Sequence, residues 1–211
     1  MISITTILVV ASVIVSYQCL NDPGLKQKLT FSPYDVKHHK KWWLIFTHGF
    51  VHADYSHLAM NMFTLYFLGS GEGGVESLVM EEFGARGTLV YLLLYFGAMA
   101  FASLPSLVKH GDHEWYCAVG ASGAVSAIVF AFILFRPVDN LLIYGIIPIP
   151  GVILGVLYIA FETYANKKNQ TNIAHDAHIA GAIFGVLFLI LLNHELFFKF
   201  LTSISDKISS L

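Results

Sequence analysis

The chain has 211 residues, of which 56% are hydrophobic and only 12% are charged, and its formal net charge at pH 7 is −2. Soluble domains carry about 25% charged residues, so the composition excludes an ordinary soluble protein, and the charge gives no sign of nucleic-acid binding. A mean hydropathy of +0.66 agrees with this. We therefore predict an all-α, polytopic membrane protein that forms a single membrane-embedded domain over residues 1–211.

The apolar stretches divide into membrane spans. A bilayer core about 30 Å thick needs about 20 residues per helix, and shorter helices are tolerated inside a bundle. The chain start lacks the basic region and the small-residue cleavage pattern of a signal peptide, so we expect a retained first span. The sequence predicts six spans with these approximate bounds: Ile2–Cys19, Tyr55–Gly69, Arg86–Leu107, Ala121–Phe135, Gly151–Tyr164 and Ala174–Leu192.

The segments between the spans are polar, with one exception. Asn21–Lys41 is polar and leads into Trp42-Trp43, an aromatic pair typical of headgroup depth. Several glutamates predict a wet loop after the second span: Glu72, Glu76, Glu81 and Glu82.

The exception is Val138–Pro150, which is apolar but contains Pro148 and Pro150, each without a backbone donor. We interpret this segment as a loop, with one long kinked helix as the alternative. Asn166–Thr171 is expected to be a short link. Residues 43–192 would form the domain core, and the amphipathic tail 193–211 is expected to lie at the interface.

The number of spans fixes their directions. With six spans, the second, fourth and sixth all begin on the membrane face opposite the N-terminus. Residues near these three starts therefore share a depth, so motifs that are distant in sequence can meet.

The fourth span opens with Gly120-Ala121-Ser122-Gly123. The first N–H groups of a helix have no acceptor within the helix. Together with the positive end of the helix dipole, they suit a developing oxyanion. Ser122 is thus a candidate nucleophile. The pattern alone is weak, because small residues at a contact between helices also produce it.

The sixth span begins with Ala177-His178 and continues through Gly181 and Gly185. Two glycines four residues apart allow a close approach between membrane helices. His178 precedes Gly181 by three residues and so lies on the same helix side. The glycines therefore direct His178 toward the neighbouring helix, where an imidazole could take the proton of a serine hydroxyl. On its own, His178 is more simply a packed intramembrane histidine.

Other polar side chains lie in or near the spans. His57 and Asn61 are four residues apart on one helix face, and both can donate hydrogen bonds to an oxyanion, although Asn61 alone could simply bond a neighbouring helix. His48 and His52 are expected before the second span, at headgroup depth. Ser126 could bond a neighbouring helix or its own backbone.

Taken together, these motifs resemble the rhomboid family of intramembrane serine proteases. The chain is similar to that family at His57 and Asn61 in the second helix, at Gly120–Gly123, and at Ala177–Gly185 in the sixth, over about Trp43–Leu192. The resemblance implies a six-helix bundle and a Ser122–His178 dyad without a carboxylate. It also implies an oxyanion hole made by His57, Asn61 and the Ser122 N–H.

The family's activity sets the expected partners. The resemblance implies substrates that are transmembrane proteins in the lipid bilayer and cleavage that needs no cofactor or metal. Substrate entry would pass the fifth helix, Gly151–Tyr164, beneath the loop Asn166–Thr171.

Three positions depart from the family pattern. Trp43-Leu44 stands where many members have Trp-Arg, so a charge in the first loop is absent. Ser126 replaces an aromatic residue that in some members stacks on the histidine, and its hydroxyl could bond the imidazole instead. Asp176 lies two residues from His178, on roughly the opposite helix face, and is expected to be a solvated helix-start residue.

The resemblance implies an active face outside the cytoplasm, and we expect a bacterial inner membrane. The distribution of cations favours the opposite orientation, because basic residues concentrate in cytoplasmic loops. The N-terminal side would hold Arg86, Arg136, Lys199 and Lys207, and the other side Lys26, Lys28, Lys37, Lys40, Lys41, Lys109, Lys167 and Lys168. We give the motifs more weight than the cation count.

Two other functions remain open from the sequence. A catalytically inactive relative could bind or traffic membrane proteins, although such relatives usually lack the serine or the histidine. A metal-dependent enzyme could use the ten histidines, but no His-Glu-x-x-His motif is present. Cys19 and Cys117 could pair on an oxidising side, although two free thiols are the simpler expectation.

Overall fold

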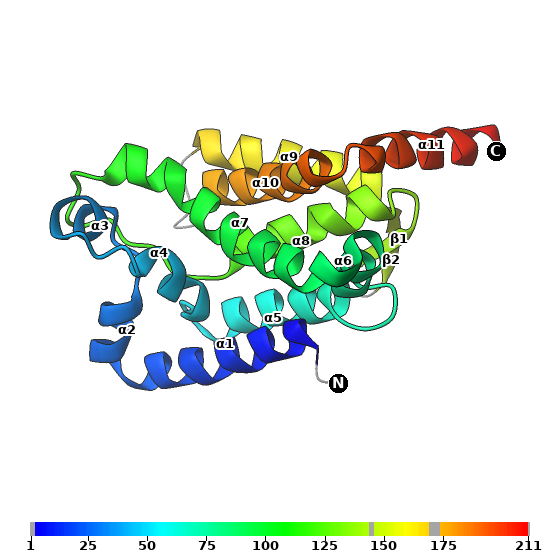
Figure 1. The fold of residues 1–211 in the computed structure, drawn as a ribbon. Helices are drawn as coiled ribbons and strands as arrows, with labels where there is room; N and C mark the ends of the chain where they lie inside the picture. The colour runs from blue at the N-terminus through cyan, green and yellow to red at the C-terminus, as the bar shows by residue number, and fades with distance from the viewer. Residues whose placement is uncertain (1–2, 144–145, 169–173, 211) are drawn as a thin grey trace.

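The computed structural model describes residues 3–143, 146–168 and 174–210. It consists of helices and one two-stranded hairpin (Figure 1). The helices of the first half are α1 (Ile4–Asn21), α2 (Pro23–Leu29), α3 (Pro33–His39), α4 (Leu44–Thr47), α5 (Tyr55–Gly69), α6 (Val75–Phe83) and α7 (Gly87–His110), with 3-10 turns η1 (His48–Phe50) and η2 (Gly84–Arg86). The second half holds α8 (Ser122–Phe135), β1 (Asn140–Ile143), β2 (Ile147–Pro150), α9 (Gly151–Lys168), α10 (His175–Leu192) and α11 (Glu195–Ser209).

Each expected span corresponds to a helix, and α5 has the expected bounds. Three helical stretches of the described residues are long and apolar enough to cross a membrane, namely Ile4–Asn21, Val75–His110 and His175–Leu192. Ser122–Phe135 is apolar but shorter. The helical, membrane-spanning character is therefore confirmed, whereas the count of six spans stays a prediction.

The segment Val138–Pro150 differs from both interpretations of the sequence. It forms an antiparallel hairpin in which Asn140 faces Pro150 and Leu142 faces Pro148. The loop and the kinked helix are both wrong. Proline cannot donate to a ladder, but it is accepted in an edge strand, and each strand of this two-stranded ribbon has a free edge.

The wet loop expected around the glutamates is also wrong in part, because residues 75–83 form helix α6. Glu76 accepts hydrogen bonds at 2.8 Å from the backbone N–H groups of Ile4 and Thr5, so it caps the start of α1. Glu82 binds the side chains of Asn193 and Lys199, at 2.6 and 2.8 Å. These carboxylates connect α6 to α1 and to α11.

Helix α8 lies at the centre and contacts α5, α7, α9 and α10. Its apolar side chains join a continuous core with those of its neighbours, which includes the fully buried Tyr91, Leu94, Ile128 and Leu189. Burial of this kind fixes the position of the first turn of α8. Cys19, which is buried, and Cys117, which is exposed, are both free thiols.

Helices α9 and α11 lie at the margin of the bundle. Helix α9 lies beside α10, and α11 extends beyond the bundle (Figure 1). The link expected at Asn166–Thr171 is helical as far as Lys168, and residues 169–173 lie outside the described residues. The interfacial position of the tail stays a prediction.

Candidate active site

Ser122 is the first residue of α8, after an irregular segment that ends in Gly120 and Ala121. Gly120 has φ of +119°, a backbone conformation that favours glycine. Its N–H donates to the carbonyl oxygen of His48 at 3.0 Å, which fixes the segment against η1. Because Ser122 begins the helix, its N–H is among those without an acceptor in the preceding turn.

His178, in the first turn of α10, lies against Ser122. The Nε2 atom of His178 is 2.8 Å from Ser122 Oγ, which is hydrogen-bond distance. The approach of the two helices depends on small residues. A Cβ at Gly181 would overlap the carbonyl oxygen of Gly123, and one at Gly185 would lie 2.5 Å from the carbonyl oxygen of Ala127.

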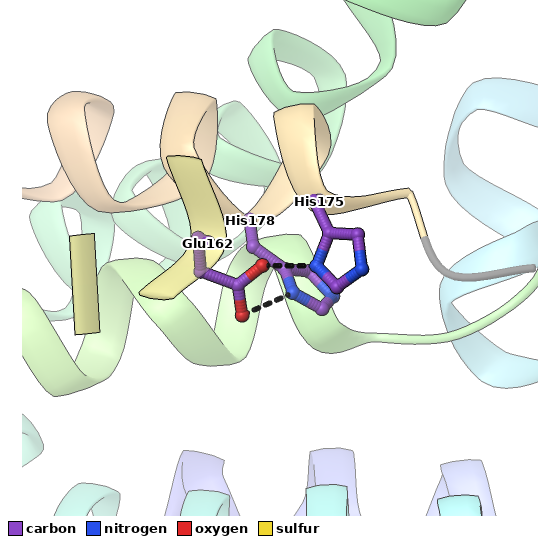
Figure 2. Close-up of side chains that lie close together, drawn as sticks. All are labelled: Glu162, His175 and His178. Carbon is purple, nitrogen blue, oxygen red and sulfur yellow. Dashed lines mark hydrogen bonds and ion pairs between the residues drawn. The ribbon is translucent and has the colours of Figure 1, made fainter. Parts of the chain in front are cut away.

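The other ring nitrogen of His178 contacts a residue that the sequence reasoning missed. Figure 2 shows Glu162 of α9 beside two histidines of α10, with one carboxylate oxygen directed at each ring. Glu162 Oε1 is 3.0 Å from His178 Nδ1, and Oε2 is 2.6 Å from His175 Nδ1. The signal was present in the sequence, because Glu162 is a carboxylate inside an expected span, and such residues are usually functional.

His57 and Asn61 occupy one side of α5, and His57 lies next to the segment that leads into Ser122. A Cβ at Gly120 would lie 2.6 Å from Cε1 of the His57 ring, so this ring packs directly on the backbone of Gly120. The Asn61 amide nitrogen donates to the carbonyl oxygen of His57 at 2.9 Å, so it is engaged within its own helix.

Asp54 is the N-cap of α5 and places the helix start that carries His57. Its Oδ1 accepts from the Ser56 hydroxyl at 2.6 Å and from the His57 N–H at 2.8 Å. These donors hold the pKa of Asp54 below its usual range, so the cap is charged and favours the helix dipole at neutral pH.

Ser126 does not take the position suggested by the family pattern. Its hydroxyl donates to the carbonyl oxygen of Ser122 at 2.8 Å and accepts from the Tyr158 hydroxyl at 2.7 Å. It therefore bonds both its own backbone and the neighbouring α9, the two partners considered from the sequence, in place of the possible bond to the imidazole. Asp176 forms an ion pair with Lys109 at the helix start.

The remaining histidines of the sequence analysis have structural partners. His48 is buried and its Nδ1 donates to the carbonyl oxygen of Leu44 at 2.9 Å. His52 is buried with its Nδ1 2.8 Å from Ser16 Oγ, which connects the loop to α1. These two do not converge on a common site with His110 and His113, which contact each other.

Within the described ranges, possible metal-ligand atoms converge instead at Glu162, His175 and His178, where they lie within 4.8 Å of one another. A glutamate with two histidines is a donor set that zinc accepts. The hydrogen bonds shown in Figure 2 already occupy both carboxylate oxygens.

A small cavity of about 40 Å³ lies beside Ser122. Its lining combines apolar side chains with the polar residues His48, Ser103, Ser106 and Ser122. A polar cavity of this size has room for water.

Comparison with known proteins gives concordant results. The model of the rhomboid domain matches residues 39–195. The chain is 30% identical over 179 residues to RHOMBOID-like protein 12, mitochondrial, of Arabidopsis thaliana, covering 82% of this chain and 52% of that protein. It is 31% identical over 164 residues to Rhomboid-like protein 11, chloroplastic, of the same plant, covering 72% and 53%.

The chain spans about half the length of these curated relatives. Their names place them in mitochondria and chloroplasts, which gives no support to the bacterial inner membrane expected from the sequence. The family model, the two relatives and the apolar helices agree on one conclusion: this chain is an integral membrane protein that belongs to the rhomboid family.

Proposed function

We propose that this protein is an intramembrane serine endopeptidase that hydrolyses peptide bonds in or near transmembrane segments of other membrane proteins. The observation that supports this most directly is the 2.8 Å distance between Ser122 Oγ and His178 Nε2. A hydroxyl and an imidazole in this geometry are the minimum for nucleophilic catalysis. Residues 1–211 would act as one membrane-embedded domain, with its core at 43–192.

In the first half of the reaction, Ser122 Oγ attacks the carbonyl carbon of the scissile peptide bond. The hydroxyl proton moves to His178 Nε2, and a tetrahedral intermediate with a negatively charged oxygen forms. When this intermediate collapses, the C–N bond breaks and Nε2 gives its proton to the leaving amine. The product is an acyl-enzyme ester on Ser122.

Donors near the nucleophile would stabilise the oxyanion. The Ser122 N–H lies at the helix start, and the His57 ring packs against the preceding Gly120, which supports their assignment as oxyanion donors. Asn61 would have to exchange its bond to the His57 carbonyl for one to substrate. Water then attacks the ester carbonyl carbon and gives a proton to His178 Nε2; the C–O bond to Ser122 breaks, Nε2 returns the proton to Ser122 Oγ, and the acyl product leaves as a carboxylic acid. The cavity beside Ser122 is large enough to hold a water molecule.

Substrate would reach the site from the bilayer beside α9. Most of this helix faces outward, with Ile153, Val156 and Phe161 more than half exposed, as suits contact with lipid or an apolar substrate helix. The active face would open at the membrane surface opposite the N-terminus, as the family motifs imply.

The test is cleavage of a model transmembrane substrate by purified protein in lipid. Ser122→Ala and His178→Ala should each abolish cleavage, because either removes the nucleophile or its base. A fluorophosphonate probe should label the wild type and should not label Ser122→Ala. Cleavage by both variants at the wild-type rate would contradict the proposal.

The same experiment separates the other functions. Wild-type protein that neither cleaves nor reacts with the probe would favour the inactive, membrane-protein-binding relative. Activity should survive strong chelation, since no step of the proposed reaction uses a metal ion.

A further inference from the structure

Helix α9 contains a buried carboxylate on an otherwise outward-facing surface. Glu162 is 5% exposed, whereas the neighbouring Phe161 and Tyr164 are 62% and 58% exposed. Gly151, Gly155, Tyr158 and Glu162 follow one another at four, three and four residues, so they form a single stripe that faces the bundle. A carboxylate at such a position is costly unless its oxygens are satisfied.

Both oxygens of Glu162 are satisfied by histidines of α10 (Figure 2). Oε1 lies 3.0 Å from His178 Nδ1, and Oε2 lies 2.6 Å from His175 Nδ1. An ionised carboxylate can only accept, so each Nδ1 carries the hydrogen. The bond from His175 to Oε2 therefore fixes the rotation of the carboxylate, and this directs Oε1 at His178.

This assignment determines the tautomer of His178. With its hydrogen on Nδ1, the neutral ring has a lone pair on Nε2, and Nε2 is the atom that lies 2.8 Å from Ser122 Oγ. That is the form in which an imidazole can accept the serine proton. One chain of hydrogen bonds thus runs from α9 through α10 to α8.

We propose that Glu162 is a positioning residue that completes a Ser122–His178–Glu162 triad in place of the dyad that the family resemblance implies, an inference that rests on the proposed protease function. Glu162 holds His178 in the productive tautomer and orientation. It also stabilises the imidazolium that forms when the Ser122 proton reaches Nε2. The carboxylate keeps accepting the Nδ1 hydrogen throughout and takes no proton itself.

Neither Asp176 nor a metal ion can take the role of Glu162 at His178. Asp176 is two residues away on the same helix and is paired with Lys109. A metal ion at Glu162, His175 and His178 is the competing explanation of the cluster. Binding through Nδ1 would displace its hydrogen and leave Nε2 protonated, so a metal there and a base at Nε2 exclude each other.

The first test compares Glu162→Gln with wild type. Glutamine keeps the shape and one acceptor oxygen but removes the charge. We expect kcat for a transmembrane substrate to fall by about 10²–10⁴-fold. KM should change by about twofold or less, because Glu162 is buried and offers almost no surface to a substrate. Fluorophosphonate labelling of Ser122 should slow in parallel, and this small probe does not depend on entry past α9.

Tyr158→Phe is the matched control. Tyr158 lies one turn earlier on the same stripe and holds α9 to α8 through Ser126, without a contact to His178. If Glu162 only attaches α9 to the bundle, the two variants should lose similar thermal stability and have similar kcat. We expect Tyr158→Phe to keep kcat within about twofold of wild type.

A second variant and a chelation experiment complete the design. Glu162→Asp keeps a carboxylate and should retain at least about tenfold more activity than Glu162→Gln. Any of three outcomes would overturn the triad. The Glu162→Gln variant could keep the kcat and the labelling of the wild type, the Gln and Asp variants could lose equal activity, or the wild type could stop cleaving substrate in a chelator. A wild type that neither cleaves nor labels would instead overturn the protease function itself.

Discussion

At the scale of single residues, Gly120 determines how closely His57 approaches the segment that carries Ser122. Two independent features require glycine there. Its φ is +119°, and a side-chain Cβ would lie 2.6 Å from His57 Cε1 and 2.9 Å from its Nε2. Either a strained backbone or a displaced imidazole would follow from any substitution, and both would disturb the proposed oxyanion site.

We therefore expect Gly120→Ala to be harmful to activity. Backbone strain costs about 1–3 kcal/mol, and displacement of His57 should lower kcat by about tenfold or more, since 1.4 kcal/mol of barrier corresponds to a tenfold change in rate. Gly71→Ala is the control. Gly71 also has positive φ, at +80°, but nothing lies within 4 Å of its Cβ position. The Gly71→Ala variant should lose stability but keep the kcat of the wild type. Equal kcat in Gly120→Ala and Gly71→Ala would refute a role for the His57 contact.

The residues of the candidate site differ in how far the sequence could reveal them. Ser122 and His178 could be singled out because each opens a span and is flanked by glycines that indicate close packing. Glu162 was missed because its partners depend on which face of α9 meets α10, and that is a tertiary contact. The spacing of Gly151, Gly155 and Glu162 places them on one side of the helix, but the hydrophobicity of the segment does not indicate which neighbour that side meets.

At the scale of helices, the crossing of α8 and α10 brings Ser122 Oγ and His178 Nε2 together. Gly181 contacts the backbone of Gly123, and Gly185 contacts the backbone of Ala127. Backbone atoms cannot move aside as a flexible side chain can. The separation of these two helices is thus set by the absence of side chains at positions 181 and 185.

Gly181→Ala should therefore push α10 away from α8. We expect a loss of stability of about 1–3 kcal/mol from overpacking and a fall in activity of about 10²-fold, because displacement of a catalytic group by about 1 Å has an effect of that size. Both can be measured by thermal unfolding and substrate cleavage in detergent.

Gly155→Ala on α9 is the comparison for this variant. Its Cβ would lie 3.3 Å from Ile133 Cδ1, the end of a flexible side chain. It should keep most of its activity. If Gly155→Ala and Gly181→Ala are equally impaired, helix separation at the Ser122–His178 pair is not the cause.

The helix bounds were largely predictable, because long apolar runs ended by polar or glycine-rich segments mark spans wherever they occur. The hairpin β1–β2 was not. Its prolines indicated only that a helix could not continue, and strand pairing depends on a partner strand that local composition does not identify. Helix α6 could not be predicted for a similar reason. Its glutamates bond to residues that are distant in the sequence, and local composition shows them only as a polar surface.

At the scale of the whole molecule, α6 connects parts of the chain that are far apart in sequence. Glu76 accepts from the N–H groups of Ile4 and Thr5 and from the Thr5 hydroxyl, at 2.7–2.8 Å. Glu82, on the same helix, accepts from Asn193 and Lys199. One nine-residue helix thus attaches both α1 and α11.

Glu76→Ala should loosen α1, because it removes the acceptor of three donors at the start of that helix. We expect a decrease in the free energy of unfolding of about 1–3 kcal/mol, seen as a lower Tm, with kcat little changed because α1 is remote from Ser122. Glu72→Ala, which changes a carboxylate four residues earlier, outside α6, should leave Tm near that of wild type. An equal decrease in Tm for both variants would count against the capping role.

The attachment of α1 to α6 has a consequence for biosynthesis. The N–H groups of Ile4 and Thr5 must meet Glu76, which lies 72 and 71 positions later in the chain. Helix α1 therefore leaves the ribosome long before its acceptor exists. At about 5–20 residues per second the delay is roughly 4–14 s, during which two amide groups at the start of α1 lack their carboxylate partner. Helix α11 is made after Glu82 and can dock as soon as it emerges, so of the two helices that α6 attaches, α1 is the one that waits for its partner.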